Sequence, residues 1–343
     1  MRKTKSILIY LFTIFPFLII YGQNINDDQA GEITMGIISD VHADILPDAK
    51  ERMDVFIAQA NDIDADLIIQ LGDFCRPNEN EKFMMESWMN FHGNRYHVLG
   101  NHDMDFNTKK ETIEYWGMPA PYYSFDQNGF HFIVLDANYL YQDGKYIDYA
   151  HANFYVESED RAYINPEQMA WLKEDLQKTD KRCLLFSHQS LINVLWGINN
   201  RVEIQEILEQ ANEEAGFQKV IACFNGHDHV DFHREINGIH YFEINSAGYQ
   251  WMGEGYADEN CYDSTLASSY HHLDKVAIYK DPLFAFVTIT QEQLILKGVA
   301  SEWYCESPND KGIPKKPYGC EYSPSISNYS VQIQNNTTKK QKP

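Results

Sequence analysis

Five short polar segments constrain this chain more than any other feature, because each carries Asp or His and each directly follows an apolar run. They are Ser39-Asp40-Val41-His42, Gly72-Asp73, Gly100-Asn101-His102-Asp103, Ser187-His188 and Gly226-His227-Asp228-His229. In an α/β sheet, the loops at the carboxyl ends of the strands converge on one site. We therefore predict that these side chains, although distant in sequence, meet at one edge of a sheet.

The pattern around these segments predicts an α/β fold. Runs typical of buried strands occupy residues 33–39, 67–71, 96–99, 182–186 and 220–224, and helical spacing of apolar residues occurs within 53–60, 81–91 and 201–214. Asn165-Pro166 predicts the start of another helix, while Asn128-Gly129 and Asn237-Gly238 predict hairpins. Further strands are expected at 276–279, 284–289 and 294–299. Strands that alternate with helices indicate a sheet covered by helices.

The residue types in the five segments point to metal chemistry. Imidazole and carboxylate together suit Zn, Mn or Fe, whereas Ca or Mg sites prefer oxygen alone. Asp40 and His42 stand at alternate positions, as do His227 and His229, and an extended chain turns such a pair to one side. Two ions about 3.5–4 Å apart can clamp the attacking and leaving oxygens of an in-line displacement. They also lower the pKa of a bound water.

In content, order and spacing, the five segments resemble the calcineurin-like metallophosphoesterase superfamily over roughly residues 33–300. The resemblance implies a sandwich of two mixed β-sheets flanked by helices. It implies a first ion held by Asp40, His42, Asp73 and His229, and a second held by Asp73, Asn101, His188 and His227. His102 would act on the leaving oxygen, with Asp103 orienting it. The implied reaction is hydrolysis of phosphomonoesters or phosphodiesters by metal-activated hydroxide, with two divalent ions (Mn, Zn or Fe) as cofactors.

Departures from the family patterns narrow the branch. Purple acid phosphatases carry a tyrosine ligand three residues after the bridging aspartate, where this chain has Arg76. The Ser/Thr protein phosphatases have Glu after the Asn-His pair, where this chain has Asp103. Asn-His-Asp looks more like the cyclic-nucleotide and glycerophosphodiester phosphodiesterases and their exported relatives. Arg76 itself is predicted to bind a substrate phosphate, the alternative being an ion pair with Glu79 or Glu81.

Two other functions fit the same segments. A pyrophosphatase acting on nucleotide-sugar or nucleoside-diphosphate substrates would share the metal site, and a binding protein of this fold would have lost catalysis. The second is disfavoured because every ligand position and His102 are present. Asp228 is expected to face away from the metals, and His97 and His131 are expected to fill structural positions. The stretch with Trp251, Tyr270 and His271-His272 either lines a substrate pocket or forms a solvated loop.

The chain's ends predict export. A basic start followed by an apolar run from Ile7 to Ile20 is typical of a signal peptide, assigned to residues 1–22. The protein is therefore expected to be periplasmic or secreted, with no stable membrane insertion after cleavage. The catalytic domain is assigned to residues 31–300, and residues 301–343 to a partly disordered C-terminal extension that frays beyond Ser325.

Charge and cysteine content add two expectations. The formal net charge of -22 repels a phosphate backbone, so the expected partner is a small-molecule phosphate ester and not a nucleic acid. Export permits disulfides, and a pair between Cys305 and Cys320 would close a short loop, although the connectivity stays open. Cysteines 75, 183 and 223 lie in or just after apolar runs and are expected to be buried thiols.

Overall fold

The computed structural model describes residues 31–193, 196–254, 256, 261–262, 264–270, 272–313, 319–320 and 322–335. The expected signal peptide and His271 lie outside these residues. Within the described residues, no helix is both long enough and apolar enough to cross a membrane.

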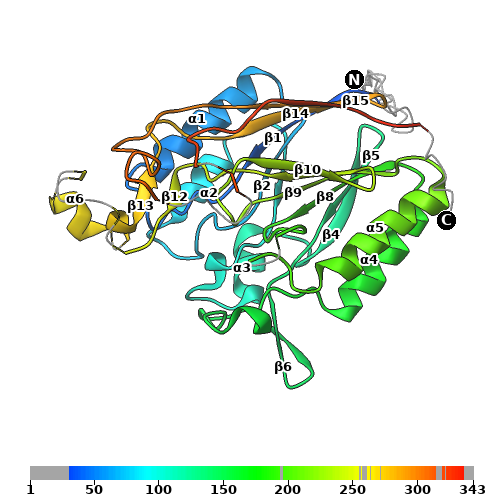
Figure 1. Ribbon diagram of the computed structural model, residues 1–343, viewed down its shortest axis with the longest axis horizontal. Coiled ribbons are helices and arrows are strands. Elements are labelled where there is room, and N and C mark those ends of the chain that lie inside the picture. The colour runs from blue at the N-terminus through cyan, green and yellow to red at the C-terminus, as the bar shows by residue number, and fades with distance from the viewer. Residues whose placement is uncertain are drawn as a thin grey trace, which may run out of the picture.

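Two six-stranded sheets form the body of the molecule (Figure 1). The first has the order β16 (Tyr329–Gln332), β15 (Gln293–Gly298), β14 (Ala285–Ile289), β1 (Ile33–Ile38), β2 (Leu67–Gln70) and β3 (Asn94–His97). The second has the order β10 (Phe232–Ile236), β11 (Ile239–Glu243), β9 (Val220–Asn225), β8 (Arg182–Ser187), β5 (Phe130–Val134) and β4 (Tyr123–Gln127). Each sheet contains both parallel and antiparallel pairs, which confirms the predicted sandwich of two mixed sheets.

Helices cover the outer faces of the sandwich. In Figure 1, α1 (Ala49–Asp62) and α2 (Lys82–Trp88) lie beside the first sheet, and α4 (Pro166–Lys178) and α5 (Arg201–Ala215) lie along the second. Alternate side chains of the second sheet face opposite ways, as the pleat requires. One face carries a row of stacked phenylalanines toward the core between the sheets, namely Phe125, Phe132, Phe186, Phe224 and Phe242. The other face carries Leu185 and Cys223 into a separate core with α4 and α5.

Local signals account for several helix ends. The side chain of Asn165 accepts a hydrogen bond from the Gln168 backbone N–H at 2.8 Å, as expected for the residue that caps α4. Helix α5 ends at Gly216, whose φ of 75° suits glycine. Helix α3 (Lys109–Trp116) was not predicted, although Thr108 and Glu111 form a capping box at its start.

The remaining elements are short. They are β6 (Tyr139–Gln142), β7 (Lys145–Asp148), β12 (Tyr249–Trp251), β13 (Val276–Ile278), α6 (Ser264–Ser269), and the 3-10 turns η1 (His102–Met104), η2 (Ser158–Asp160) and η3 (Leu273–Lys275).

The structure corrects the interpretation of the C-terminal region. The chain beyond Ser325 was expected to fray, but Tyr329–Gln332 form β16 and pair with β15 from Leu296↔Tyr329 to Gln293↔Gln332. The first sheet therefore extends past residue 300, where the domain was expected to end. The alternation of Tyr329 and Val331 toward the core explains why this strand packs.

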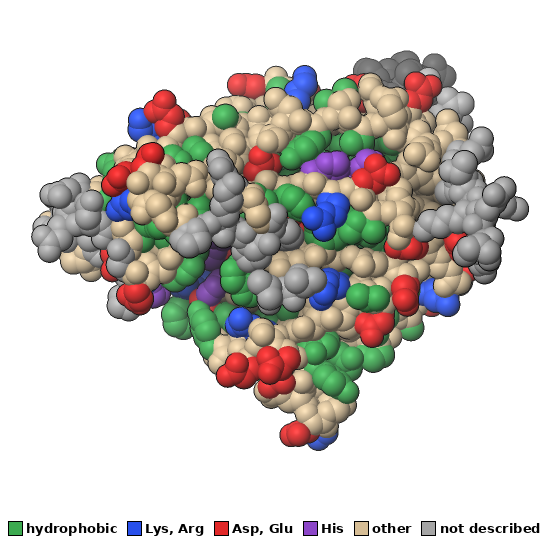
Figure 2. Space-filling view, in the orientation of Figure 1, with side chains coloured by type: hydrophobic (Ala, Val, Ile, Leu, Met, Phe, Trp, Pro, Cys, Tyr) green, Lys and Arg blue, Asp and Glu red, His purple; other side chains and the backbone are tan. Residues whose placement is uncertain are grey.

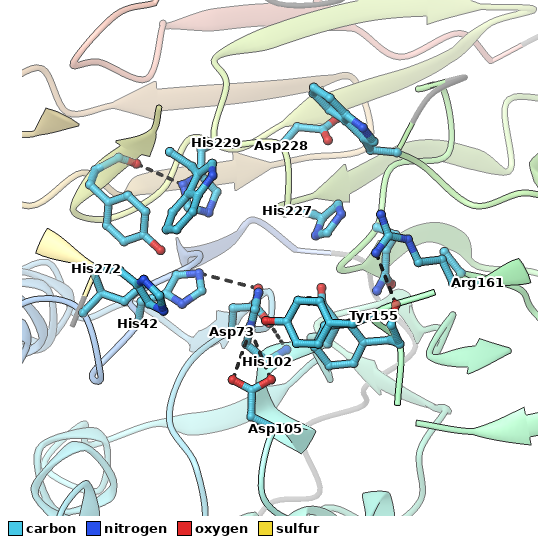
Figure 3. Close-up of a pocket in the computed structure, with 18 of the residues that line it drawn as sticks. His42, Asp73, His102, Asp105, Tyr155, Arg161, His227, Asp228, His229 and His272 are labelled. Atoms are coloured by element: carbon cyan, nitrogen blue, oxygen red, sulfur yellow. Dashed lines mark hydrogen bonds and ion pairs between the residues drawn. The ribbon is translucent and has the colours of Figure 1, made fainter. Parts of the chain in front are cut away.

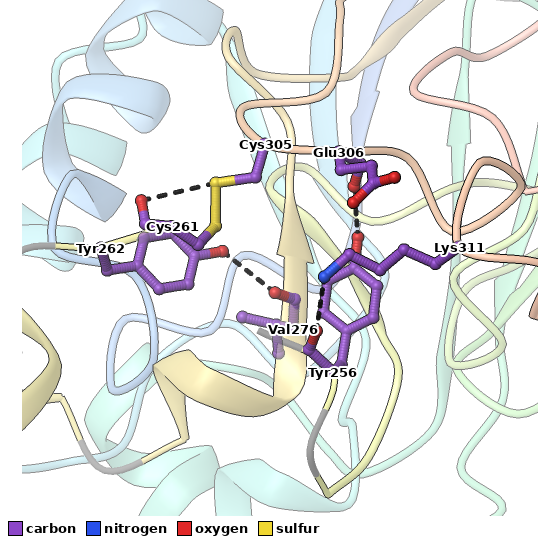
Figure 4. Close-up of a disulfide and its surroundings, with 7 residues drawn as sticks. All are labelled: Tyr256, Cys261, Tyr262, Val276, Cys305, Glu306 and Lys311. Carbon is purple, nitrogen blue, oxygen red and sulfur yellow. Dashed lines mark hydrogen bonds between the residues drawn. A yellow bond between two sulfur atoms is a disulfide. The ribbon is translucent and has the colours of Figure 1, made fainter. Parts of the chain in front are cut away.

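The disulfide also differs from the expected pair. Cys261 bonds to Cys305, so Cys305 does not pair with Cys320 (Figure 4). The Tyr256 hydroxyl donates to the Glu306 backbone oxygen at 2.7 Å, and Lys311 Nζ donates to the Tyr256 backbone oxygen at 2.8 Å. These contacts bring two chain segments together that are 44 residues apart, which sequence spacing did not indicate. The buried thiols of Cys75, Cys183 and Cys223 are as predicted.

Candidate metal centre

The five polar segments meet at the carboxyl ends of β1, β2, β3, β8 and β9. Two groups of possible ligands result, Asp40 with His42 and His229, and Asp73 with His188 and His227. Within each group, one ligand atom per residue lies within 4.8 Å of the others. Figure 3 shows members of both groups along the wall of one cavity. The predicted convergence of these segments is therefore what the structure shows.

Asp73 lies between the two groups. Its Oδ2 is 3.2 Å from His188 Nε2 and 3.6 Å from His42 Nε2, which belong to different groups. Asn101 Oδ1 lies 3.2 Å from His188 Nε2 and thereby joins the second group. All seven predicted ligands are thus brought together, and Asp73 occupies the position that a bridging carboxylate requires.

The ligands project from a strained backbone and not from an extended one. Left-handed φ angles occur at Asp40 (50°), His42 (49°), Asp73 (49°), His227 (66°) and His229 (50°). The extended geometry that we inferred from their alternate spacing is therefore wrong, although the side chains do converge. Such conformations cost on the order of 1–3 kcal/mol each and persist where surrounding contacts hold them. Backbone hydrogen bonds from Asp40 N to Gly72 O (3.1 Å) and from His42 N to Asp73 O (3.0 Å) supply part of that hold.

Hydrogen bonds behind the ligands fix two imidazole rings. His188 Nδ1 lies 2.8 Å from the Leu71 backbone oxygen, and His229 Nδ1 lies 3.0 Å from the Tyr249 backbone oxygen. A carbonyl partner makes Nδ1 the protonated nitrogen, so Nε2 is left as the acceptor that a metal needs. Both rings therefore present Nε2 to the centre.

The electrostatics of the centre favour a cation. Burial opposes ionisation of Asp40, but His229 and His188 outweigh it and hold the pKa of this carboxyl below its usual range. Burial lowers the pKa of His188, yet Asp73 and Asp40 raise it to about 10. Burial and the neighbouring His188 lower the pKa of His227 to about 3. The buried carboxylates thus draw positive charge to the centre, here as a proton on His188. These carboxylates, with imidazoles that release their protons on metal binding, fit divalent ions such as Zn, Mn or Fe.

His102 lies beside the two groups without belonging to either. Its Nδ1 is 3.1 Å from Asp105 Oδ2, which leaves Nε2 for the cavity. Burial lowers the pKa of His102, but Asp73 and Asp105 raise it to about 9. This imidazole is therefore suited to hold a proton for a leaving oxygen, the role that the resemblance implied.

Asp103 has a different position from the predicted one. The contact with His102 that we expected of Asp103 is made by Asp105. Asp103 instead accepts backbone N–H groups from Gly100 (2.7 Å), Phe74 (2.8 Å) and Asp73 (3.0 Å), so it shapes the loops that carry the ligands.

Arg76 lines the cavity but is shared among carboxylates. Its Nη2 donates to Asp44 and, at 3.0 Å, to Asp105, and its Nη1 lies 3.7 Å from Glu81. The geometry thus favours ion pairing, including the pair with Glu81 that was the alternative. Binding of substrate phosphate by Arg76 stays a prediction, which the KM of an Arg76→Lys variant would test.

The cavity over the centre has a volume of about 740 Å³. Trp251 and His272 line it, in agreement with the pocket interpretation of their stretch. Asp228, expected to face away from the metals, also lines it, but its Oδ2 accepts from Asn193 Nδ2 at 2.7 Å and it joins neither ligand group.

Three further lining residues, Tyr155, Arg161 and Trp196, were missed by the sequence analysis. They follow no motif, and their place at the cavity depends on the fold of the segments that carry them, residues 149–165 and 196–200.

The structure is thus a sandwich of two mixed sheets with two Asp/His groups at the strand ends, each able to hold a metal ion. The pattern of the calcineurin-like phosphoesterase family matches residues 33–231, and the chain belongs to this family. This is the family that the five polar segments were found to resemble.

Individual known proteins are also similar to this chain, in sequence or in fold. Purple acid phosphatase 23 of Arabidopsis thaliana is 28% identical over 177 residues, which are 46% of this chain and 33% of the relative. The chain thus spans about a third of that relative's length. A dimetal phosphatase from Danio rerio superposes with a TM-score of 0.57 at 16% identity, covering 80% of this chain and 99% of the other. GAP50, the anchor in the inner membrane complex of Plasmodium, superposes with a TM-score of 0.51 at 13% identity, covering 90% of each chain. Both structures share the fold.

Proposed function

We propose that this protein hydrolyses small phosphate esters, monoesters or diesters, at a centre of two divalent ions. One ion would be held by Asp40, His42, Asp73 and His229, and the other by Asp73, Asn101, His188 and His227. The observation that carries the proposal is the position of Asp73 Oδ2 between His188 and His42. When bound, the ions would supply Lewis-acid charge and a water of lowered pKa.

The chain's own residues supply the rest of the chemistry. His102, held by Asp105 through Nδ1, keeps a proton at Nε2 for the leaving oxygen. The left-handed turns at Asp40, His42 and Asp73 preorganise the ligand side chains before an ion arrives. The burial of Asp40, Asp73 and His188 limits the access of bulk water, which strengthens every charge interaction in the centre.

The small-ester proposal is supported by the surface as well as by the cavity. On the face shown in Figure 2, the described Lys and Arg side chains stand singly among acidic and apolar ones. A nucleic-acid partner would need a basic stripe to neutralise phosphates. We therefore keep the expectation of a small-molecule substrate.

We also propose that the protein is exported. The basic and apolar start of the chain supports this proposal, and so does the Cys261–Cys305 disulfide, because such bonds persist in oxidising compartments. N-terminal sequencing of protein recovered outside the cytoplasm tests it. A start near residue 23 is expected, and recovery only in the cytoplasm with an intact Met1 would refute it.

Metal reconstitution tests the main proposal. Protein stripped with a chelator is reloaded with Mn, Zn or Fe(II) and assayed on p-nitrophenyl phosphate and bis-p-nitrophenyl phosphate. We expect turnover to return with close to two ions per chain. Loading of two ions without turnover on any phosphate ester would indicate the alternative, a binding protein of this fold.

A further inference from the structure

Two arginines line the cavity, and they differ in what they are bound to. Arg76 is engaged by Asp44, Asp105 and Glu81. Arg161 has no ion pair within the described part of the chain, and its Nη1 donates only to the Phe154 backbone oxygen, at 3.2 Å. A half-buried guanidinium beside an acidic centre, with donors to spare, is suited to a planar anion such as a phosphoryl group.

The backbone around Arg161 is fixed. The Asn199 side chain donates to the Arg161 backbone oxygen at 2.6 Å, and the Asn199 backbone N–H donates to the Ala162 oxygen at 2.8 Å. Ala162 has a left-handed φ of 59°, and its N–H donates to the Tyr149 hydroxyl at 2.8 Å. A strained non-glycine turn held from both sides orients the preceding side chain. In Figure 3, Arg161 extends toward His227 and Tyr155.

Exposed aromatic rings surround the same cavity. Tyr155 is 68% exposed, Trp196 is 46% exposed and Trp251 is 45% exposed, and all three line the cavity. Trp196 and Trp251 are the two tryptophans found among the exposed large side chains of the described residues. Open ring faces of this kind stack with flat ligands, and such stacking contributes about 1–3 kcal/mol per base.

We propose that the substrate carries two phosphoryl groups and an aromatic ring, as a nucleoside diphosphate does. This inference rests on the proposed two-ion centre and its phosphoryl hydrolysis. It extends the substrate of that centre from phosphate esters to the phosphoanhydride of a diphosphate, the pyrophosphatase alternative named above. The scissile terminal phosphoryl group lies at the two ligand groups, the second phosphoryl group lies at Arg161, and the ring stacks at Trp196. A cavity of about 740 Å³ has room for such a molecule.

The reaction needs no partner besides water. The water oxygen bonds to the terminal phosphorus, the bond from that phosphorus to the bridging oxygen breaks, and the protons of the water end on the released phosphate and the surrounding solvent. The products are a nucleoside monophosphate and inorganic phosphate.

Three substrates separate the contributions. ADP has both phosphoryl groups and the ring, AMP lacks the second phosphoryl group, and p-nitrophenyl phosphate lacks the nucleoside as well. For Arg161→Gln we expect the KM for ADP to rise about 10–100-fold, the range for a charged hydrogen bond, with the KM for AMP unchanged within about twofold. For Trp196→Ala we expect the KM for both nucleotides to rise roughly 5-fold or more. Arg234→Gln, which removes an arginine outside the cavity lining, is the matched control.

The possible results distinguish failure of the second phosphoryl site from failure of the proposed function. Equal rises in KM for ADP and AMP in Arg161→Gln would show that Arg161 only holds its loop, and would overturn the second phosphoryl site. Binding of adenosine 5′-(α,β-methylene)diphosphate, measured by calorimetry, gives a readout without turnover, and unchanged affinity in Arg161→Gln would overturn it too. Lack of turnover by the metal-loaded wild-type protein on all three substrates and on bis-p-nitrophenyl phosphate would instead refute the proposed function.

Discussion

Asp105 offers the sharpest test of how the chain controls His102. Its carboxylate lies 3.1 Å from His102 Nδ1 and 3.0 Å from Arg76 Nη2. Asp105→Asn keeps the size and one acceptor for Arg76 but removes the negative charge beside the imidazole. Since that charge helps to raise the pKa of His102 to about 9, the pKa should fall in the variant. A lost charged hydrogen bond is worth about 1.5–3 kcal/mol, so kcat should fall roughly 10–100-fold.

The assay compares two leaving groups. Alkyl phosphates need proton assistance more than aryl phosphates, so the loss in kcat should be larger for the alkyl esters. Metal content, measured by elemental analysis, should stay at the wild-type value. Asp126→Asn is the matched control, because Asp126 pairs with His131 outside the cavity. Equal losses for both leaving groups, or a His102 titration by NMR that does not move, would refute the reasoning.

The sign of the pH dependence follows from the same contact. Because the pKa of His102 is raised in the folded state, its protonation stabilises the protein. This stabilisation is fully present below the unfolded pKa of about 6.5 and is lost as pH rises through about 9. In the metal-free protein, Asp105→Asn should therefore lower stability most at acidic and neutral pH. Denaturant unfolding between pH 6 and pH 9.5 measures this difference, which should shrink toward the alkaline end.

Three further predictions concern other parts of the chain. Asp73→Asn should keep the fold but lower the metal content below two ions per chain. Its kcat should fall about 10³-fold or more, since a bound metal contributes several kcal/mol. Activity within tenfold of wild type at saturating metal would refute the bridging role. Gly226→Ala should destabilise the protein by about 1–3 kcal/mol and weaken metal binding by the group of Asp40, His42 and His229, because the new Cβ would lie 2.5 Å from Asp40 Oδ2. Denaturant unfolding measures the stability and elemental analysis the metal content. No change in either would count against this prediction. Burial lowers the pKa of His131, but its two carboxylate partners raise it above the usual value. Stability should therefore fall as pH rises above about 6.5 through that raised pKa. In His131→Gln this fall should be absent from the unfolding curves, and an unaltered pH profile would contradict the assignment.

The sequence predicted the fold because local patterns and the sandwich agree. The apolar run at 182–186 appears as β8, the hairpin signal at Asn237-Gly238 joins β10 to β11, and Gly216 ends α5. These signals depend on residues close together in the chain. Strand β16 was missed because the residues of β15 with which it pairs lie 33 to 39 positions earlier, and its four residues have a weak pattern of their own. The Cys261–Cys305 pair was missed for the same reason, since only the folded chain brings those segments together.

The candidate site also has features that the sequence predicted and features that only the folded chain shows. The candidate ligands could be chosen from the sequence because imidazole and carboxylate at strand ends have few other uses in such a combination, and the order of the motifs narrowed the choice further. The backbone geometry was not predictable, because left-handed φ angles at Asp40 and His42 depend on hydrogen bonds from a different loop. The positions of the residues that we propose to act on the substrate or on His102 were also not predictable. Asp105 reaches His102 only because the chain turns through η1, and Arg161 reaches the cavity only because Asn199 holds its loop. The candidate metal ligands are therefore recognisable from local motifs, whereas the residues proposed to select the substrate lie on loops whose positions the tertiary structure sets.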